Sequence, residues 1–92
     1  MVEANATVRL FAALRDAAGT GAVVVAAPVP LPALLRDLGS RFGDRFTARL
    51  AIAAVMVDGA PVDPGGDLEV QPGQEVALLP PFAGGAGDVA SP

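Results

Sequence analysis

The chain's clearest pattern is Leu31-Pro32-Ala33-Leu34-Leu35-Arg36-Asp37-Leu38-Gly39-Ser40-Arg41-Phe42, in which an apolar residue recurs every three or four positions. This spacing predicts an amphipathic helix that covers a core with one face. Pro32 fits the first helical turn, where a missing N–H is harmless. Gly39 weakens the pattern by about 1 kcal/mol relative to Ala, so we expect the helix to end early. The apolar stripe consists of Leu31, Leu34, Leu35, Leu38 and Phe42.

Two predicted strands precede this helix. Residues 7–11 begin with alternating polarity and are rich in β-forming residues, and residues 21–25 end in three valines. Residues 12–19 between them predict a loop with a helical turn. We therefore expect a hairpin with a long connection. Pro28, Pro30 and Pro32 are expected to prevent regular strand pairing after it.

A second short helix is predicted directly after the first. Gly43 is a stop signal and Asp44 is a suitable N-cap for a helix from Arg45 to about Ala51. Its apolar residues are expected to pack inward, and these are Phe46, Leu50 and Ile52.

Short strands fill the rest of the domain. Residues 55–57 form the first of them, and Asp58-Gly59 is a strong hairpin-turn signal before a return strand at Val62. Leu68 and Val70 predict another short strand, and residues 75–79 predict the last one.

This order of elements predicts an α+β fold of the β-grasp (ubiquitin-like) type. A hairpin, a crossover helix and a final strand that pairs beside the first give a mixed sheet of four to five strands, with one main helix packed on one face. We expect a β-grasp domain over residues 1–79 and an extended arm over residues 80–85. Residues 86–92 are expected to be a disordered extension that can be removed.

The composition argues against independent catalysis. The chain has no Cys, His, Lys, Tyr or Trp, which removes the thiol and amine nucleophiles, the imidazole base and nearly every soft metal ligand. We therefore expect no bound metal or cofactor. A net charge of −4 disfavours a nucleic-acid surface. No apolar run is long enough to cross a membrane and no secretory signal is visible, so a cytoplasmic protein is expected.

The end of the chain carries the candidate functional site, Pro80-Pro81-Phe82-Ala83-Gly84-Gly85. A Gly-Gly pair is expected by chance in a chain with 11 glycines, so its context matters more than the pair itself. Six residues reach about 20 Å from the last strand. The prolines stiffen the base of this arm, and a tip without Cβ atoms can enter a narrow channel. Phe82 lies beyond the last strand and is expected to bind a partner.

Several segments together resemble the MoaD/ThiS family of ubiquitin-like sulfur carrier proteins. They are residues 8–15, Arg41-Phe42, residues 55–59 and residues 72–85, so that the resemblance covers residues 7–85. It is strongest to the MoaD type, the small subunit of molybdopterin synthase.

The resemblance implies a carrier, not an enzyme. An adenylating enzyme of the MoeB/ThiF type would use ATP to activate the carboxylate of Gly85, and a sulfur donor would convert it to a thiocarboxylate. Gly84 and Gly85 would then be the chemically active residues, and Pro80 to Gly85 would bind partners. The sulfur would pass to a synthase, such as the large subunit of molybdopterin synthase.

One departure from the family pattern is the segment Ala86-Gly87-Asp88-Val89-Ala90-Ser91-Pro92, which follows Gly85. It makes the carbonyl of Gly85 an amide, which cannot attack ATP. We therefore expect a precursor that a metalloprotease cuts after Gly85. The alternative is that the tail is a natural end or a cloning remnant.

Other functions remain open at this point. The sulfur could serve cysteine, thiamine, thio-sugar or natural-product synthesis. A different class is a non-catalytic ubiquitin-like interaction module or protein modifier. Phe11, Leu78 and Phe82 could form a docking patch, although a place in the core explains Phe11 and Leu78 at least as well.

Overall fold

The computed structural model describes residues 4–81. Seven strands and three helices follow one another in this range. They are β1 (Asn5–Leu10), α1 (Ala12–Ala18), β2 (Ala22–Ala26), β3 (Val29–Pro30), α2 (Leu31–Phe42), α3 (Asp44–Leu50), β4 (Ala54–Val57), β5 (Ala60–Val62), β6 (Glu69–Val70) and β7 (Glu75–Leu79). No helix within residues 4–81 is long and apolar enough to cross a membrane.

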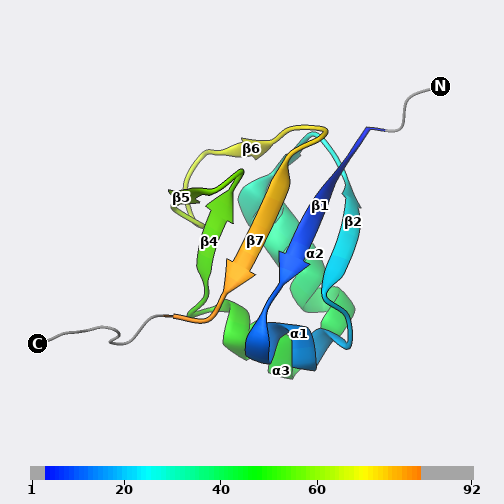
Figure 1. The fold of residues 1–92 in the computed structure, drawn as a ribbon, viewed down its shortest axis with the longest axis vertical. Coiled ribbons are helices and arrows are strands. Elements are labelled where there is room, and N and C mark those ends of the chain that lie inside the picture. The colour runs from blue at the N-terminus through cyan, green and yellow to red at the C-terminus, as the bar shows by residue number, and fades with distance from the viewer. Residues whose placement is uncertain (1–3, 82–92) are drawn as a thin grey trace, which may run out of the picture.

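Five strands form one mixed sheet in the order β2-β1-β7-β4-β5 (Figure 1). β7 lies at its centre, parallel to β1 and antiparallel to β4. The remaining pairs, β1 with β2 and β4 with β5, are antiparallel. The predicted α+β β-grasp fold, with a last strand beside the first, is thus confirmed.

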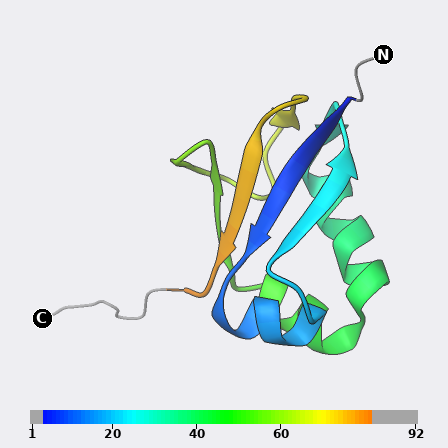
Figure 2. The same ribbon diagram turned by 45° about the vertical axis from the view of Figure 1, so that its right-hand side comes forward.

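The main helix packs on one face of this sheet, as Figure 2 shows from the side. Leu31, Leu34 and Leu38 of α2 are buried, and Leu35 and Phe42 pack against the core from its margin. Opposite them lie the inward residues of the two central strands, Val8, Leu10, Val76 and Leu78, all at most 2% exposed. Burying one such side chain stabilises the fold by about 1.5–3 kcal/mol, so the predicted stripe supplies a large share of the core.

The expected early end of α2 at Gly39 is wrong. The helix continues to Phe42, and Gly43 closes it by donating its N–H to the carbonyl of Gly39 at 2.9 Å. Gly39 has a packing function instead, because a Cβ atom there would lie 2.9 Å from the Oγ1 of Thr47 on α3. The missing side chain therefore lets α3 approach α2.

This contact predicts that Gly39→Val destabilises the protein by about 1–3 kcal/mol, although Val is the better helix former. The midpoint of chemical unfolding measures the effect. Thr47→Ala should remove most of the penalty in the double variant, because it deletes the hydroxyl that the new side chain meets. If Gly39→Val lowered the stability equally with Thr47 and with Ala at position 47, the contact with Thr47 would not be the cause.

Residues 12–19 form more regular structure than predicted. α1 has two turns anchored by the buried Leu14, and Gly19 ends it in the left-handed conformation with φ of 76°. α3 begins at Asp44, with Gly43 and not Asp44 in the N-cap position. Phe46 is buried as expected, but Ile52 is 56% exposed, so its predicted inward packing is wrong.

The proline-rich segment does pair, contrary to our expectation. Val29 and Pro30 form β3, which lies antiparallel to Glu69 and Val70 of β6 in a separate two-stranded sheet. The pairing is short and places Pro30 at its edge, where a residue without an N–H is tolerated. The N–H of Leu31 donates to the carbonyl of Leu68 at 2.9 Å, so this small sheet also anchors the start of α2.

Candidate functional site

The base of the predicted arm lies at the end of the central strand. β7 is held on both sides, with Leu78 opposite Leu10 of β1 and Leu79 opposite Ala54 of β4. Pro80 is half-buried and Pro81 is exposed. Because β7 is paired along its whole length, the direction in which the chain leaves the domain is fixed.

The remaining predicted site residues lie outside the described part of the chain. These are Phe82, Ala83, Gly84 and Gly85. The structure therefore places the base of the arm but not its tip. The predicted roles of Gly84 and Gly85 stay predictions, and so does the predicted partner contact of Phe82.

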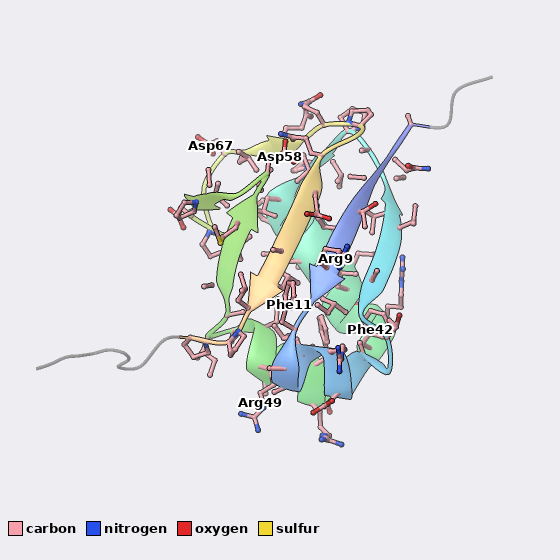
Figure 3. The ribbon with its side chains drawn as sticks, viewed as in Figure 1. Arg9, Phe11, Phe42, Arg49, Asp58 and Asp67 are labelled. Atoms are coloured by element: carbon pink, nitrogen blue, oxygen red, sulfur yellow. The ribbon has the colours of Figure 1, made fainter. Side chains whose placement is uncertain are left out.

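Two exposed apolar side chains lie at the end of the sheet where the arm begins. Phe11 follows the β1 residue that pairs with Leu78, and it is 39% exposed (Figure 3). Ile52 lies two residues before Ala54, the partner of Leu79, and is 56% exposed. Of the predicted docking patch, Phe11 is accessible, Leu78 is fully buried in the core, and Phe82 lies outside the described residues.

Within residues 4–81, no helix covers the opposite face of the sheet, which we call the open face (Figure 1). The alternation of the strands directs every second side chain onto it. Met56 of β4 pairs with Ala77 of β7 on one side and with Pro61 of β5 on the other. Ala54 and Leu79 form the next pair toward the arm. We call these five residues, Ala54, Met56, Pro61, Ala77 and Leu79, the open-face patch.

Charged residues border this patch on the β1 side. The guanidinium of Arg9 lies 3.6 Å from the carboxylate of Glu75, and both side chains are about half exposed. An exposed pair of this kind contributes little stability. The open face thus combines an apolar centre with a polar margin, which is the general anatomy of a protein–protein interface.

The prediction missed the open-face patch as a site. The sequence predicts Met56, Ala77 and Leu79 only as strand residues and assigns Ala54 and Pro61 to no strand. The alternation within residues 54–57 and 75–79 was the available signal, but both faces of these strands carry apolar residues. The face that stays uncovered becomes known only once α2 is placed.

Asp58 supports the site by fixing the turn between β4 and β5. It adopts a left-handed conformation with φ of 50°. Its carboxylate accepts hydrogen bonds from the N–H of Glu75 at 2.9 Å and from the side-chain amide of Gln74 at 3.1 Å. The predicted turn at Asp58-Gly59 is confirmed, but the expectation that the Asp58 carboxylate bonds to its local backbone is wrong, because both bonds reach Gln74 and Glu75. Asp63 bonds locally, accepting from the N–H of Gly65 at 2.9 Å.

We expect Asp58→Ala to destabilise the protein by about 1–2 kcal/mol, because two hydrogen bonds are lost and Ala tolerates positive φ poorly. Asp58→Asn should lower the stability less, since the Asn side chain can accept one hydrogen bond and adopts the left-handed conformation more readily than Ala. Thermal unfolding of both variants measures the difference. An Asn variant as unstable as the Ala variant would show that the left-handed backbone and the retained bond are unimportant.

The described residues show no constellation typical of an active site. Within residues 4–81, no three His, Cys, Asp or Glu side chains come together in a way that could hold a metal ion. No polar or charged residue in the same range is buried. A hollow of about 660 Å³ lies between α2, α3 and the loop at Pro64-Gly65, on the helical side and away from the open face.

Comparison with solved structures shows the same fold in several proteins. A candidate molybdopterin converting factor, subunit 1, from Pyrococcus furiosus is 22% identical, with 84% of this chain and 97% of that chain covered and a TM-score of 0.72. The small archaeal modifier protein 1 of Haloferax volcanii is 23% identical, with 84% of this chain and 97% of that chain covered and a TM-score of 0.70. A chain in the complex of subunits 1 and 2 of the molybdopterin-converting factor from Helicobacter pylori is 19% identical. The match covers 86% of this chain and 96% of that chain, with a TM-score of 0.65. At these identities the likeness shows the fold alone.

Sequence comparison is more specific. No curated protein matches the chain. The family model described as the ThiS family, however, matches residues 8–85, which is most of the domain and the whole predicted arm. Taken with the β-grasp sheet, the free open face and the central strand that leads into Pro80-Pro81, this match shows that the chain belongs to the ThiS family of ubiquitin-like proteins.

Proposed function

We propose that this protein is a sulfur carrier made as a precursor and activated by cleavage after Gly85. The observation that carries the proposal is the extent of the family match, which ends at Gly85 and leaves Ala86 to Pro92 outside. The family pattern therefore ends where a small, unbranched residue would become the new C-terminus. The base of the arm supports the same reading, because β7 is paired along its whole length and Pro81, the last described residue, is exposed.

The proposed chemistry takes place on the partner enzymes. A carboxylate oxygen of the released Gly85 attacks the α-phosphorus of ATP, and pyrophosphate leaves. A sulfur nucleophile then attacks the acyl carbon of the adenylate, AMP leaves, and a terminal thiocarboxylate results. The chain contains no Cys, so within its own covalent structure this terminus is the place where transferable sulfur can reside.

The domain contributes recognition. The open-face patch, with Phe11 beside the base of the arm, offers an apolar surface that includes Leu79, the residue directly before Pro80-Pro81. Docking there would hold the arm in the active site of an adenylating enzyme of the MoeB/ThiF type, and later in that of a sulfur acceptor. For the acceptor we propose a molybdopterin synthase large subunit. The likeness to subunit 1 of the Helicobacter pylori complex supports this partner at the level of the fold.

Mass spectrometry of the protein from its native host tests the proposal. We expect a chain that ends at Gly85, part of it with one oxygen replaced by sulfur. An exclusively full-length chain would contradict the cleavage. Gly85 found in amide linkage to lysines of other proteins, without any thiocarboxylate, would favour the protein modifier instead. Sulfur delivered to cysteine, thiamine, thio-sugar or natural-product synthesis would keep the carrier and replace the molybdopterin route.

A further inference from the structure

The two edges of the five-stranded sheet differ in their protection against pairing with other chains. β5 has three residues with Pro61 at its centre. β2 has five, Ala22-Val23-Val24-Val25-Ala26, without proline or charge. Proteins commonly blunt exposed edges with prolines, charges or short strands. β5 shows two of these devices and β2 shows none of them, which makes β2 a candidate pairing surface.

The hydrogen bonds at the two ends of β2 define which backbone groups face outward. The N–H of Leu10 donates to the carbonyl of Gly21 at 2.9 Å, and the N–H of Ala27 donates to the carbonyl of Ala4 at 3.1 Å. In an antiparallel ladder the hydrogen-bonded pairs recur every two residues, so Val23 and Val25 bond to β1. The backbone groups of Ala22, Val24 and Ala26 therefore point away from the sheet.

Local features limit the open length of this edge. The hydroxyl of Thr20 donates to the carbonyl of Ala22 at 3.1 Å and accepts a long hydrogen bond of 3.4 Å from its N–H. Pro28 has no N–H to donate beyond the other end. Within residues 4–81 no element lies next to β2 on its outer side (Figures 1 and 2). The backbone N–H and carbonyl groups of Val24 and Ala26 are therefore accessible. Those of Ala22 are engaged by the hydroxyl of Thr20.

The sequence of β2 reads the same in both directions, Ala-Val-Val-Val-Ala. We propose that its partner is β2 of a second copy of this chain, paired antiparallel about a two-fold axis through Val24. In this register Val24 faces Val24, Ala22 faces Ala26, and Val23 faces Val25. The outward N–H and carbonyl groups of both strands are then matched, which an isologous interface requires.

The side chains favour a second copy over an unrelated extended peptide. Val24 is 63% exposed, and pairing places it beside its symmetry mate, where β-branched side chains pack well across strands. No charged or polar side chain on β2 would select a different partner sequence. A pairing of five residues buries little surface, so the dimer is weak and reversible.

The proposed dimer leaves the arm accessible. A two-fold axis perpendicular to the sheet puts both open faces on the same side and joins the two sheets through their β2 edges. β2 and β7 are separated by β1 in each sheet, so the base of each arm stays clear of the interface. The dimer is therefore independent of the proposed carrier function, and each proposal can fail without the other.

Sedimentation equilibrium of the full chain at increasing concentration tests the dimer. We expect association to become visible by about 1 mM, the range of weak interfaces. Val24→Lys places like charges opposite each other and should weaken association at least about fivefold. Ala26→Pro should act similarly, because it removes an outward N–H without breaking a bond to β1. Val24→Thr, a β-branched and uncharged replacement, should associate nearly as the parent does.

The register has its own test. Opposed residues that do not share hydrogen bonds bring their Cα atoms to about 4.5 Å. A mixture of isotope-labelled and unlabelled protein should therefore give an intermolecular contact between the α-protons of Val23 and Val25. A strictly monomeric protein at about 1 mM would overturn the proposal. So would association that Met56→Glu weakens and Val24→Lys does not, because the open face would then be the interface.

Discussion

A chain that ends at Gly85 is expected to support ATP–pyrophosphate exchange on its activating enzyme at least about a hundredfold faster than the 92-residue chain, which corresponds to about 2.7 kcal/mol in activation free energy. The reason is chemical. In the longer chain the carbonyl of Gly85 belongs to a peptide bond, so no carboxylate oxygen is present at the position that the arm delivers. Pyrophosphate exchange reports adenylate formation directly.

Chains that end one residue earlier or later are the matched controls. Ending at Gly84 or at Ala86 keeps a free carboxylate but shifts it by one residue. Positioning of reacting atoms accounts for several kcal/mol in catalysis, so both controls should exchange at least about tenfold more slowly than the chain that ends at Gly85. Equal rates of pyrophosphate exchange for the full-length chain and the chain that ends at Gly85 would contradict the proposal that residues 86–92 prevent activation.

The second large effect is expected on the open face. Met56→Glu should raise the dissociation constant for the activating enzyme at least about tenfold, because a buried charge without a partner replaces an apolar contact at the centre of the interface. Met56 is only half-buried in the free domain and contributes to the outer face of β4, so the fold should tolerate the change. Titration calorimetry with the activating enzyme measures the affinity.

Ala48→Glu is the control for added charge. Ala48 is exposed on α3, which packs against α1 and α2 at the end of the sheet and contributes no residue to the open-face patch (Figure 1). This variant should bind as the parent does. Loss of affinity in both variants would indicate a general effect of net charge, and unchanged affinity in Met56→Glu would show that docking takes place elsewhere.

The elements that could be predicted from the sequence are those with a local signal. The leucine stripe of α2 and the turn at Asp58-Gly59 depend on spacing and on backbone preference within a few residues, and both are confirmed. The last strand, residues 75–79, has the predicted bounds as well. These elements are sufficient to define the β-grasp order.

The features that could not be predicted depend on contacts between distant segments. Pairing of Val29 with Val70 brings together residues from opposite sides of α2 in the sequence. Gly39 appears unfavourable until Thr47 of α3 is seen packed against it. The open-face patch likewise exists only through the register of three strands. Pro80 to Gly85 could be singled out as a sequence motif, whose role stays a prediction, but the open-face patch could not be singled out.

The central claim is that Gly85 carries the sulfur. Its most direct test is the intact mass of the chain ending at Gly85 after incubation with ATP, the activating enzyme and sulfide. We predict that the mass increases by the difference between sulfur and oxygen, that the change requires ATP, and that the full-length chain stays unmodified. No mass change in the shortened chain, or an equal change in both chains, would contradict the account.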